Sequence, residues 1–255
     1  GGRATLVLGS ANLANDPLPL ANAGITFTGT TIQGAGDAGT DVAIVGDVNG
    51  DGIQDYAITA PTAASGAGQA WVIYGTRAGL PSTISLAGLD ASQGFLIQGQ
   101  GITDHTGMTI AGAGDINGDG FDDVLIGAPD SDSVGNLRFT GGEAYVLLGR
   151  SDFAAQVNVN ELMGGVGGFT IYGADIADHA AASIAGGGDI DGDGFADLVI
   201  GAPGGDGSKN GTPNSGDTYV IYGRDFAGTV TKLGDTDSNL LEGGAGDDSL
   251  VGGQG

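Results

Sequence analysis

Residues 115–129, Asp115-Ile-Asn-Gly-Asp-Gly-Phe-Asp-Asp-Val-Leu-Ile-Gly-Ala-Pro129, join an acidic loop bent by glycine directly to an apolar run that ends in Gly-Ala-Pro. The nine-residue pattern Asp-x-Asn/Asp-x-Asp-Gly-x-x-Asp that opens this stretch also begins at Asp47 and at Asp189. Asn-Gly and Asp-Gly form hairpin turns well, but such turns do not need acids at positions 1, 3, 5 and 9. Three copies in register therefore predict a functional loop that leads into a strand.

The oxygen-bearing residues of each loop are spaced so that they can converge on one hard cation, and Ca²⁺ is held by such flexible oxygen ligands. The expected ligands are the side chains at positions 1, 3, 5 and 9 and the backbone carbonyl at position 7. These predicted metal ligands are Asp47, Asn49, Asp51, Ile53 and Asp55; Asp115, Asn117, Asp119, Phe121 and Asp123; and Asp189, Asp191, Asp193, Phe195 and Asp197. We expect about three Ca²⁺ ions, bound tightest in the third loop, which has four carboxylates against three in the others.

Position 12 of each loop distinguishes these sites from EF-hands, which place a glutamate there. The chain instead has Ile58, Ile126 and Ile200, each inside a short apolar run that is typical of a strand. The three loops are therefore predicted to connect strand to strand.

Each loop lies within a longer repeat. A short strand precedes it (25–29, 95–99 and 169–173), and a variable loop and a final strand follow it (68–75, 142–149 and 216–223). The loops begin 68 and then 74 residues apart. Short apolar runs that recur at such a period, separated by Gly, Pro, Asn and Asp, predict an all-β fold of four-stranded propeller blades.

The Phe-x-x-x-Gly opening, the acidic loop and the Gly-Ala-Pro ending together resemble the FG-GAP repeat of integrin alpha-subunit propellers and their bacterial relatives. The resemblance covers residues 24 to 223. The first copy departs from it, with Thr59 in place of the glycine of Gly-Ala-Pro and no phenylalanine at Gly24. The resemblance implies that calcium binds at one face of a partial propeller of about three blades. The implied segments are a last strand of a preceding blade at 1–9 and blades at 24–75, 94–149 and 168–223.

Residues 243–251, Gly-Gly-Ala-Gly-Asp-Asp-Ser-Leu-Val, fit the nonapeptide Gly-Gly-x-Gly-x-Asp-x-Leu-x and resemble the RTX (hemolysin-type) calcium repeats of exported bacterial proteins. We read 224–255 as a linker and the truncated start of an RTX parallel β-roll. A glycine-rich linker is the alternative. One roll turn cannot bury its leucine or complete a calcium shell without neighbours, so we expect poor order here and an incomplete RTX site.

Three blades and one strand are too few for a propeller of four to eight blades. We therefore expect an excerpt of a longer polypeptide, the rest of which closes the ring. The alternative is that further copies of the chain associate to complete it. An open array would expose strand edges to aggregation.

Composition narrows the class of protein. The 255 residues include 31 acids, 7 bases, 54 glycines and no cysteine, for a formal charge of −24, which argues against nucleic-acid binding. Without cysteine the chain cannot form disulfide bonds, so we expect bound metal ions to stabilise the fold instead. Sites with a Kd of roughly 10⁻⁴–10⁻³ M fill outside the cell. No apolar run approaches the length of a membrane span, so we expect no membrane insertion.

These observations predict a calcium-binding extracellular binding module, part of a secreted or surface bacterial adhesin-like protein, that recognises protein or glycan through the variable loops 131–140 and 204–215. The alternative is an accessory calcium-dependent domain, lectin-like or structural, of a larger secreted enzyme whose catalytic site lies elsewhere.

No catalytic residue is predicted. His105 and His179 each follow an aspartate, but they share one repeat position, which favours a structural role over acid–base chemistry. Neither Gly-x-Ser-x-Gly nor His-Glu-x-x-His is present. Trp71, Tyr145 and Tyr219 also share a repeat position. They are predicted to pack in the core or between blades, and sugar stacking is the alternative.

Overall fold

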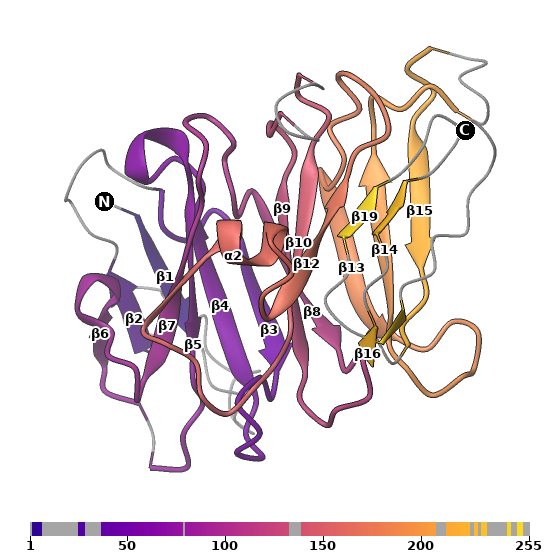
Figure 1. Cartoon of the computed structure of the whole chain (residues 1–255). Helices are drawn as coiled ribbons and strands as arrows, with labels where there is room; N and C mark the ends of the chain where they lie inside the picture. Colours follow the sequence, from indigo (N-terminus) through magenta and orange to yellow (C-terminus); the bar gives the residue numbers. More distant parts are fainter. Residues whose placement is uncertain are drawn as a thin grey trace, which may run out of the picture.

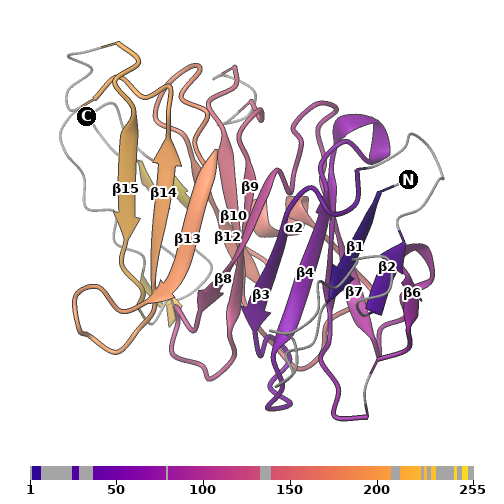
Figure 2. The same ribbon diagram turned by 180° about the vertical axis from the view of Figure 1, so that it is seen from behind.

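The computed structural model describes residues 2–6, 25–28, 37–78, 80–132, 139–207 and 213–224, and four short strands beyond them. Sheets follow one another along the chain in both views (Figures 1 and 2). The strands are β1 (Arg3–Leu6), β2 (Ile25–Thr28), β3 (Val42–Gly46), β4 (Asp55–Ala60), β5 (Gln69–Ile73), β6 (Thr83–Ser85), β7 (Gly94–Gln98), β8 (Thr109–Gly114), β9 (Asp123–Ala128), β10 (Glu143–Leu147), β11 (Gln156–Asn158), β12 (Gly168–Tyr172), β13 (Ser183–Gly188), β14 (Asp197–Ala202), β15 (Asp217–Ile221), β16 (Ala227–Gly228), β17 (Thr231–Leu233), β18 (Gly244–Ala245) and β19 (Ser249–Val251). Short helical segments are η3 (Ala64–Gly66), η4 (Leu86–Gly88) and α2 (Val159–Met163).

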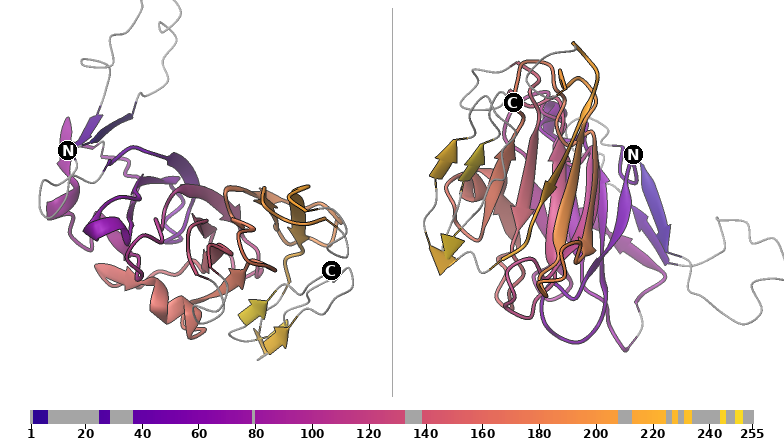
Figure 3. Two further views of the ribbon diagram at one scale, coloured as in Figure 1. Left: turned by 90° about the horizontal axis from the view of Figure 1, so that it is seen from above. Right: turned by 90° about the vertical axis from the view of Figure 1, so that its right-hand side faces the viewer.

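Three antiparallel sheets form the body of the molecule, and we name them blades 1 to 3. Blade 1 has the order β3-β4-β5-β7, blade 2 the order β8-β9-β10-β12 and blade 3 the order β13-β14-β15. Seen from above, the sheets lie one after another (Figure 3, left). The prediction of an all-β partial propeller is confirmed.

The blades are offset by one strand from the blade bounds expected from the sequence. β7 pairs with β5 and β12 pairs with β10, while β2 pairs with β1. The strand that opens each sequence repeat is therefore the outer strand of the sheet before it. Segments 24–75, 94–149 and 168–223 each combine this strand with three strands of the next sheet. Sequence periodicity identifies a strand, but it does not identify the partner on which the strand pairs.

The outer edges of the sheets are covered by parallel strands that arrive from later in the chain. β6 pairs with β2, β11 with β7 and β19 with β12, all in parallel. An uncovered edge strand invites pairing with other chains, so these additions protect the outer strands. They also bind each sheet to the next.

The hydrophobic core lies between the blades, because the central strands β4 and β9 are largely buried on both faces, whereas Val199 of β14 is half-buried. In β9, Val124 and Ile126 pack in the cluster shared with blade 1, whereas Leu125 packs in the cluster shared with blade 3. Trp71 and Tyr145 are 4% and 1% exposed, which confirms their predicted packing role, and Tyr219 is half-buried.

The C-terminal segment is described only in part. Of the nonapeptide 243–251, β18 and β19 fall within the described residues, and most of 224–255 lies outside them. The RTX-type roll and its order therefore stay predictions. In the part of the chain that the structure describes, no helix has the length and apolar character needed to span a membrane.

Candidate metal centres

The three acidic loops connect the first and second strands of blades 1, 2 and 3, at the lower end of the sheets in Figure 1. Each loop folds around the aspartate at its first position. In the first loop, Asp47 accepts hydrogen bonds from the backbone N–H groups of Asp51 (2.9 Å) and Gly52 (2.7 Å). The corresponding bonds to Asp115 and Asp189 recur in the other two loops. Gly52 has a φ of 80°, the left-handed conformation expected for this turn.

The residues at positions 3 and 5 are turned toward the loop backbone. In the first loop, Asn49 Oδ1 accepts the N–H of Asp51 at 3.0 Å, and Asp51 Oδ1 accepts the N–H of Ile53 at 2.9 Å. In the second loop, the side-chain amide of Asn117 donates a hydrogen bond to Oδ2 of Asp119 at 2.9 Å.

The aspartate at position 9 is the buried member of each set. Asp55, Asp123 and Asp197 are 0%, 0% and 1% exposed. Asp123 accepts the N–H groups of Ile116 (2.9 Å) and Gly149 (2.7 Å). Asp55 accepts the N–H groups of Val48 and Gly75 in the same way. Asp197 accepts those of Ile190 and Gly223. This carboxylate therefore joins its loop to the end of the third strand of the same blade.

The glycines that donate to position 9 were missed as functional residues by sequence reasoning. They are Gly75, Gly149 and Gly223, which end the final strands predicted from the sequence and lie just after β5, β10 and β15. A Cβ at Gly149 would lie 2.5 Å from the carbonyl oxygen of Asp122. The signal was present in the sequence, since each final strand ends in glycine.

Burial changes the proton affinity of the position-9 carboxyls. Desolvation raises the pKa of Asp123 to about 8 and that of Asp55 to about 6, although backbone N–H bonds act in the opposite direction. The other acids of each loop raise both values further. A cation in the loop would favour the ionised carboxylates.

The third loop brings its carboxylates closest together. Oxygen atoms of Asp189, Asp191 and Asp197 lie within 4.8 Å of one another. Among the described residues, this is the one set of three or more His, Cys, Asp or Glu side chains that converges in this way. The first two loops have an asparagine at position 3, so they offer an amide oxygen there. Asp193 is outside the converging set, and its Oδ1 accepts the N–H of Phe195 at 2.9 Å.

Neighbouring loops also contact one another, which sequence reasoning did not predict. Asp122 Oδ2 accepts the N–H of Asp47 at 2.7 Å, and the N–H of Asp122 donates to the carbonyl of Asp47 at 3.1 Å. The ring of Phe121 lies against Gly50, where a Cβ would be 2.5 Å from the ring. Phe195 packs on Gly118 in the same manner. The three loops therefore form one continuous row.

At the opposite end of blade 2, a cavity of about 220 Å³ has an acidic lining that includes Asp104, Asp132 and Glu143. Asp132 belongs to the predicted recognition loop 131–140, of which 133–138 lie outside the described residues, as do 208–212 of the second predicted loop. Glu143 is 3% exposed and accepts a hydrogen bond from the Tyr145 hydroxyl. Burial raises the pKa of Glu143 above its usual value.

We expect Glu143→Gln to reduce the loss of stability that occurs as pH rises above the ordinary pKa of a glutamate, about 4.3. The folded state retains the Glu143 proton to a higher pH than the unfolded state, whose pKa is about 4.3. The stabilisation is therefore present below that value and is lost as pH rises through the folded pKa. Glutamine keeps an oxygen acceptor for Tyr145 but does not titrate.

Urea unfolding at several pH values in saturating calcium measures this difference. Glu161→Gln, a change at an exposed glutamate of α2, is the control and should follow the native curve. Parallel curves for Glu143→Gln and the native protein would contradict the prediction.

Comparison with known families supports the repeat architecture that the fold and the loops indicate. The FG-GAP repeat matches residues 38–73, 106–147 and 180–221, which contain the three inner strands of each blade. Integrin alpha-V of Gallus gallus is 30% identical over 202 residues, covering 78% of this chain and 16% of that protein. Integrin alpha-PS2 of Drosophila melanogaster is 28% identical over 184 residues, covering 71% and 11%. Integrin alpha-4 of Xenopus laevis is 31% identical over 159 residues, covering 61% and 13%.

The three blades thus coincide with the three stretches that match the FG-GAP repeat. The chain carries three FG-GAP repeats and has integrin alpha homologues, and it spans 16% or less of the length of the three relatives named above.

Proposed function

We propose that this chain is a calcium-stabilised extracellular binding module of a larger secreted or cell-surface protein. The observation that carries the proposal is the third loop, where Asp189, Asp191 and Asp197 converge within 4.8 Å. Hard oxygen ligands at this spacing suit Ca²⁺. The matching hydrogen bonds around Asp47 and Asp115 support equivalent sites in the first two loops, and hence about three ions.

Calcium would act on the folding of the array. Each loop gathers carboxylates that repel one another without a cation, and binding turns this repulsion into coordination that is coupled to folding. Because Asp122 of the second loop holds the backbone of Asp47 in the first, order in one loop supports its neighbour. The proposed ions would therefore stabilise the row of loops along one end of the blades.

The opposite end of the blades is the proposed recognition face. The described ends of the variable loops and the acidic cavity of blade 2 lie there, and rigid sheets commonly carry binding residues on such loops. We propose a protein or glycan ligand, in the setting of a bacterial adhesin with an RTX-type segment after the blades. We assign no catalytic role to the residues of this chain. A screen of glycans and matrix proteins, with and without calcium, tests the proposal; absence of any calcium-dependent ligand would contradict it.

We expect Asp191→Asn to weaken calcium binding in the third loop by roughly tenfold, because it removes one carboxylate and gives the loop the amide present in the first two. Calorimetric titration of the metal-free protein measures the three affinities. The reverse change, Asn49→Asp, is the matched variant and should strengthen binding in the first loop. If neither substitution alters any affinity, position 3 is not a ligand.

A further inference from the structure

An apolar groove lies on the face of blade 1 that is turned away from blade 2, and we call this face the open face. The groove has a volume of about 370 Å³ and is lined by β1 together with β3 and β4. Its lining includes Leu6, Val42 and Ile44. Val42 and Ile44 are 56% and 70% exposed. Exposed apolar side chains that gather around a groove are typical of an interaction site.

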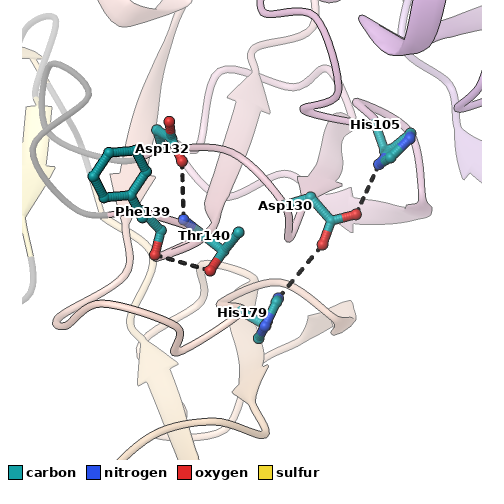
Figure 4. Close-up of polar contacts among 6 residues, drawn as sticks. All are labelled: His105, Asp130, Asp132, Phe139, Thr140 and His179. Carbon is teal, nitrogen blue, oxygen red and sulfur yellow. Dashed lines mark hydrogen bonds and ion pairs between the residues drawn. The ribbon is translucent and has the colours of Figure 1, made fainter.

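The corresponding faces of blades 2 and 3 are covered by the blade before them. Ile110 of blade 2 has the repeat position of Val42, and it is 5% exposed because it packs in the core shared with blade 1. Blades 2 and 3 are also joined at the end opposite the acidic loops, where Oδ2 of Asp130 lies 2.7 Å from Nδ1 of His105 and Oδ1 of Asp130 lies 3.5 Å from Nδ1 of His179 (Figure 4). The open face of blade 1 therefore continues a series of interfaces between consecutive sheets.

β1 offers a backbone edge beside this groove. Its sequence is similar to that of the third strands β5, β10 and β15, and it pairs with β2 as β5 pairs with β7 and β10 with β12. Those third strands also pair antiparallel with a second strand, which is β4, β9 or β14. Among the described residues, β1 has β2 as its one strand partner. A free strand edge next to an apolar groove is the arrangement to which an extended segment can be added.

The second strands of the array show which chemistry fits that place. β9 is buried along its whole length, and its side chains alternate between two cores. Val124 and Ile126 face blade 1, whereas Leu125 faces blade 3. A strand added to β1 in the same sense would direct the residue at the Leu125 position toward blade 1, because side chains along a strand alternate between its faces.

One position distinguishes the open face from the two interfaces inside the array. A Cβ at Gly112 of blade 2 would lie 3.0 Å from the carbonyl oxygen of Ile44. A Cβ at Gly186 of blade 3 would lie 2.7 Å from the Cα of Ala113, so each glycine admits the backbone of the preceding blade. Blade 1 has Ile44 itself at this repeat position. An occupant of the groove therefore meets an isoleucine side chain there, which favours contact with another apolar side chain.

We propose that the groove binds one extended apolar strand, which pairs antiparallel with the free edge of β1 and places the residue at its Leu125 position against Val42 and Ile44. The partner is a second-strand segment of another FG-GAP repeat, with the chemistry of residues 123–128: an aspartate followed by residues that are apolar on both faces of the strand. This strand site does not depend on the proposed calcium sites or on the proposed recognition face.

The test uses the full chain in millimolar calcium and a fluorescent peptide with the sequence of residues 121–130, which contains β9. Fluorescence anisotropy measures binding of the peptide. The groove variant is Val42→Asp. Val166→Asp is its matched control, because Val166 is 59% exposed and is not among the residues that line the groove. The control peptide carries Leu125→Asp. Amide hydrogen exchange in β1 is the second readout, since an added strand would occupy its free edge.

We expect the native chain and Val166→Asp to bind the peptide equally. Val42→Asp and the Leu125→Asp peptide should each weaken binding by about tenfold or more, because a charge is then buried in an apolar contact. Amide exchange in β1 should slow when the native peptide is added. The proposal is overturned if the peptide does not bind, if Val42→Asp binds it as the native chain does, or if exchange in β1 is unchanged. Self-association of the chain that Val42→Asp abolishes would assign the groove to a second copy and would overturn it as well.

Discussion

Removal of calcium is expected to lower the melting temperature by roughly 10 °C, and return of millimolar calcium should restore it. With a Kd of about 10⁻⁴ M and ten times that concentration of free ion, each filled loop stabilises the folded state by about 1.4 kcal/mol. Three loops together contribute about 4 kcal/mol. In a chain of this size each kcal/mol shifts the melting temperature by about 2–4 °C.

Calorimetric melting in chelator, in calcium and in magnesium measures this effect. Magnesium is the control, because it needs near-ideal octahedral geometry and gives up its water reluctantly, so it should restore less of the stability. Superimposable curves in chelator and in calcium would remove the basis of the proposed function.

Asp123→Ala is expected to destabilise the protein by about 3–5 kcal/mol, more than alanine at the exposed Asp119 of the same loop. Asp123 is fully buried and accepts the N–H groups of Ile116 and Gly149. Alanine leaves both donors without a partner inside the protein, at about 1–3 kcal/mol each, and creates a small cavity. The loop then loses its attachment to the end of β10.

Urea unfolding in chelator isolates this structural role from any effect of metal. Asp119→Ala is the matched control, since Asp119 is exposed in the same loop and its Oδ1 accepts one backbone N–H, that of Phe121. It should cost about 1 kcal/mol. Asp123→Asn, which keeps one oxygen acceptor, should fall between the two. Equal losses for Asp123→Ala and Asp119→Ala would refute the assigned role of the buried carboxylate.

The sequence was sufficient to predict features that depend on neighbours in the chain. The pattern of acids and glycines identified each loop, and the positive φ of Gly52 and the N–H contacts of Asp47 follow from it. The apolar run after Asp123 predicted β9. Its burial on both faces is consistent with three successive apolar residues between two sheets.

Other features depended on contacts between distant residues. The strand at 95–98 was recognised as a strand, but its pairing with β5 placed it in the sheet before the one expected. Position 9 was predicted as a ligand, but its bond to Gly149, 26 residues away, was not. Such partners are chosen by the packing of sheets, and a one-dimensional pattern does not record them.

The sequence by itself determined the kind of fold and the chemistry of the loops, because a repeated pattern of short strands and oxygen donors acts over a few residues at a time. Only the tertiary structure decided which strand closes each blade, how Asp122 links two loops, and that Asp130 lies between His105 and His179. These residues are brought together when blades pack face to face, which buries Leu125 on one side of β9 and Val124 on the other.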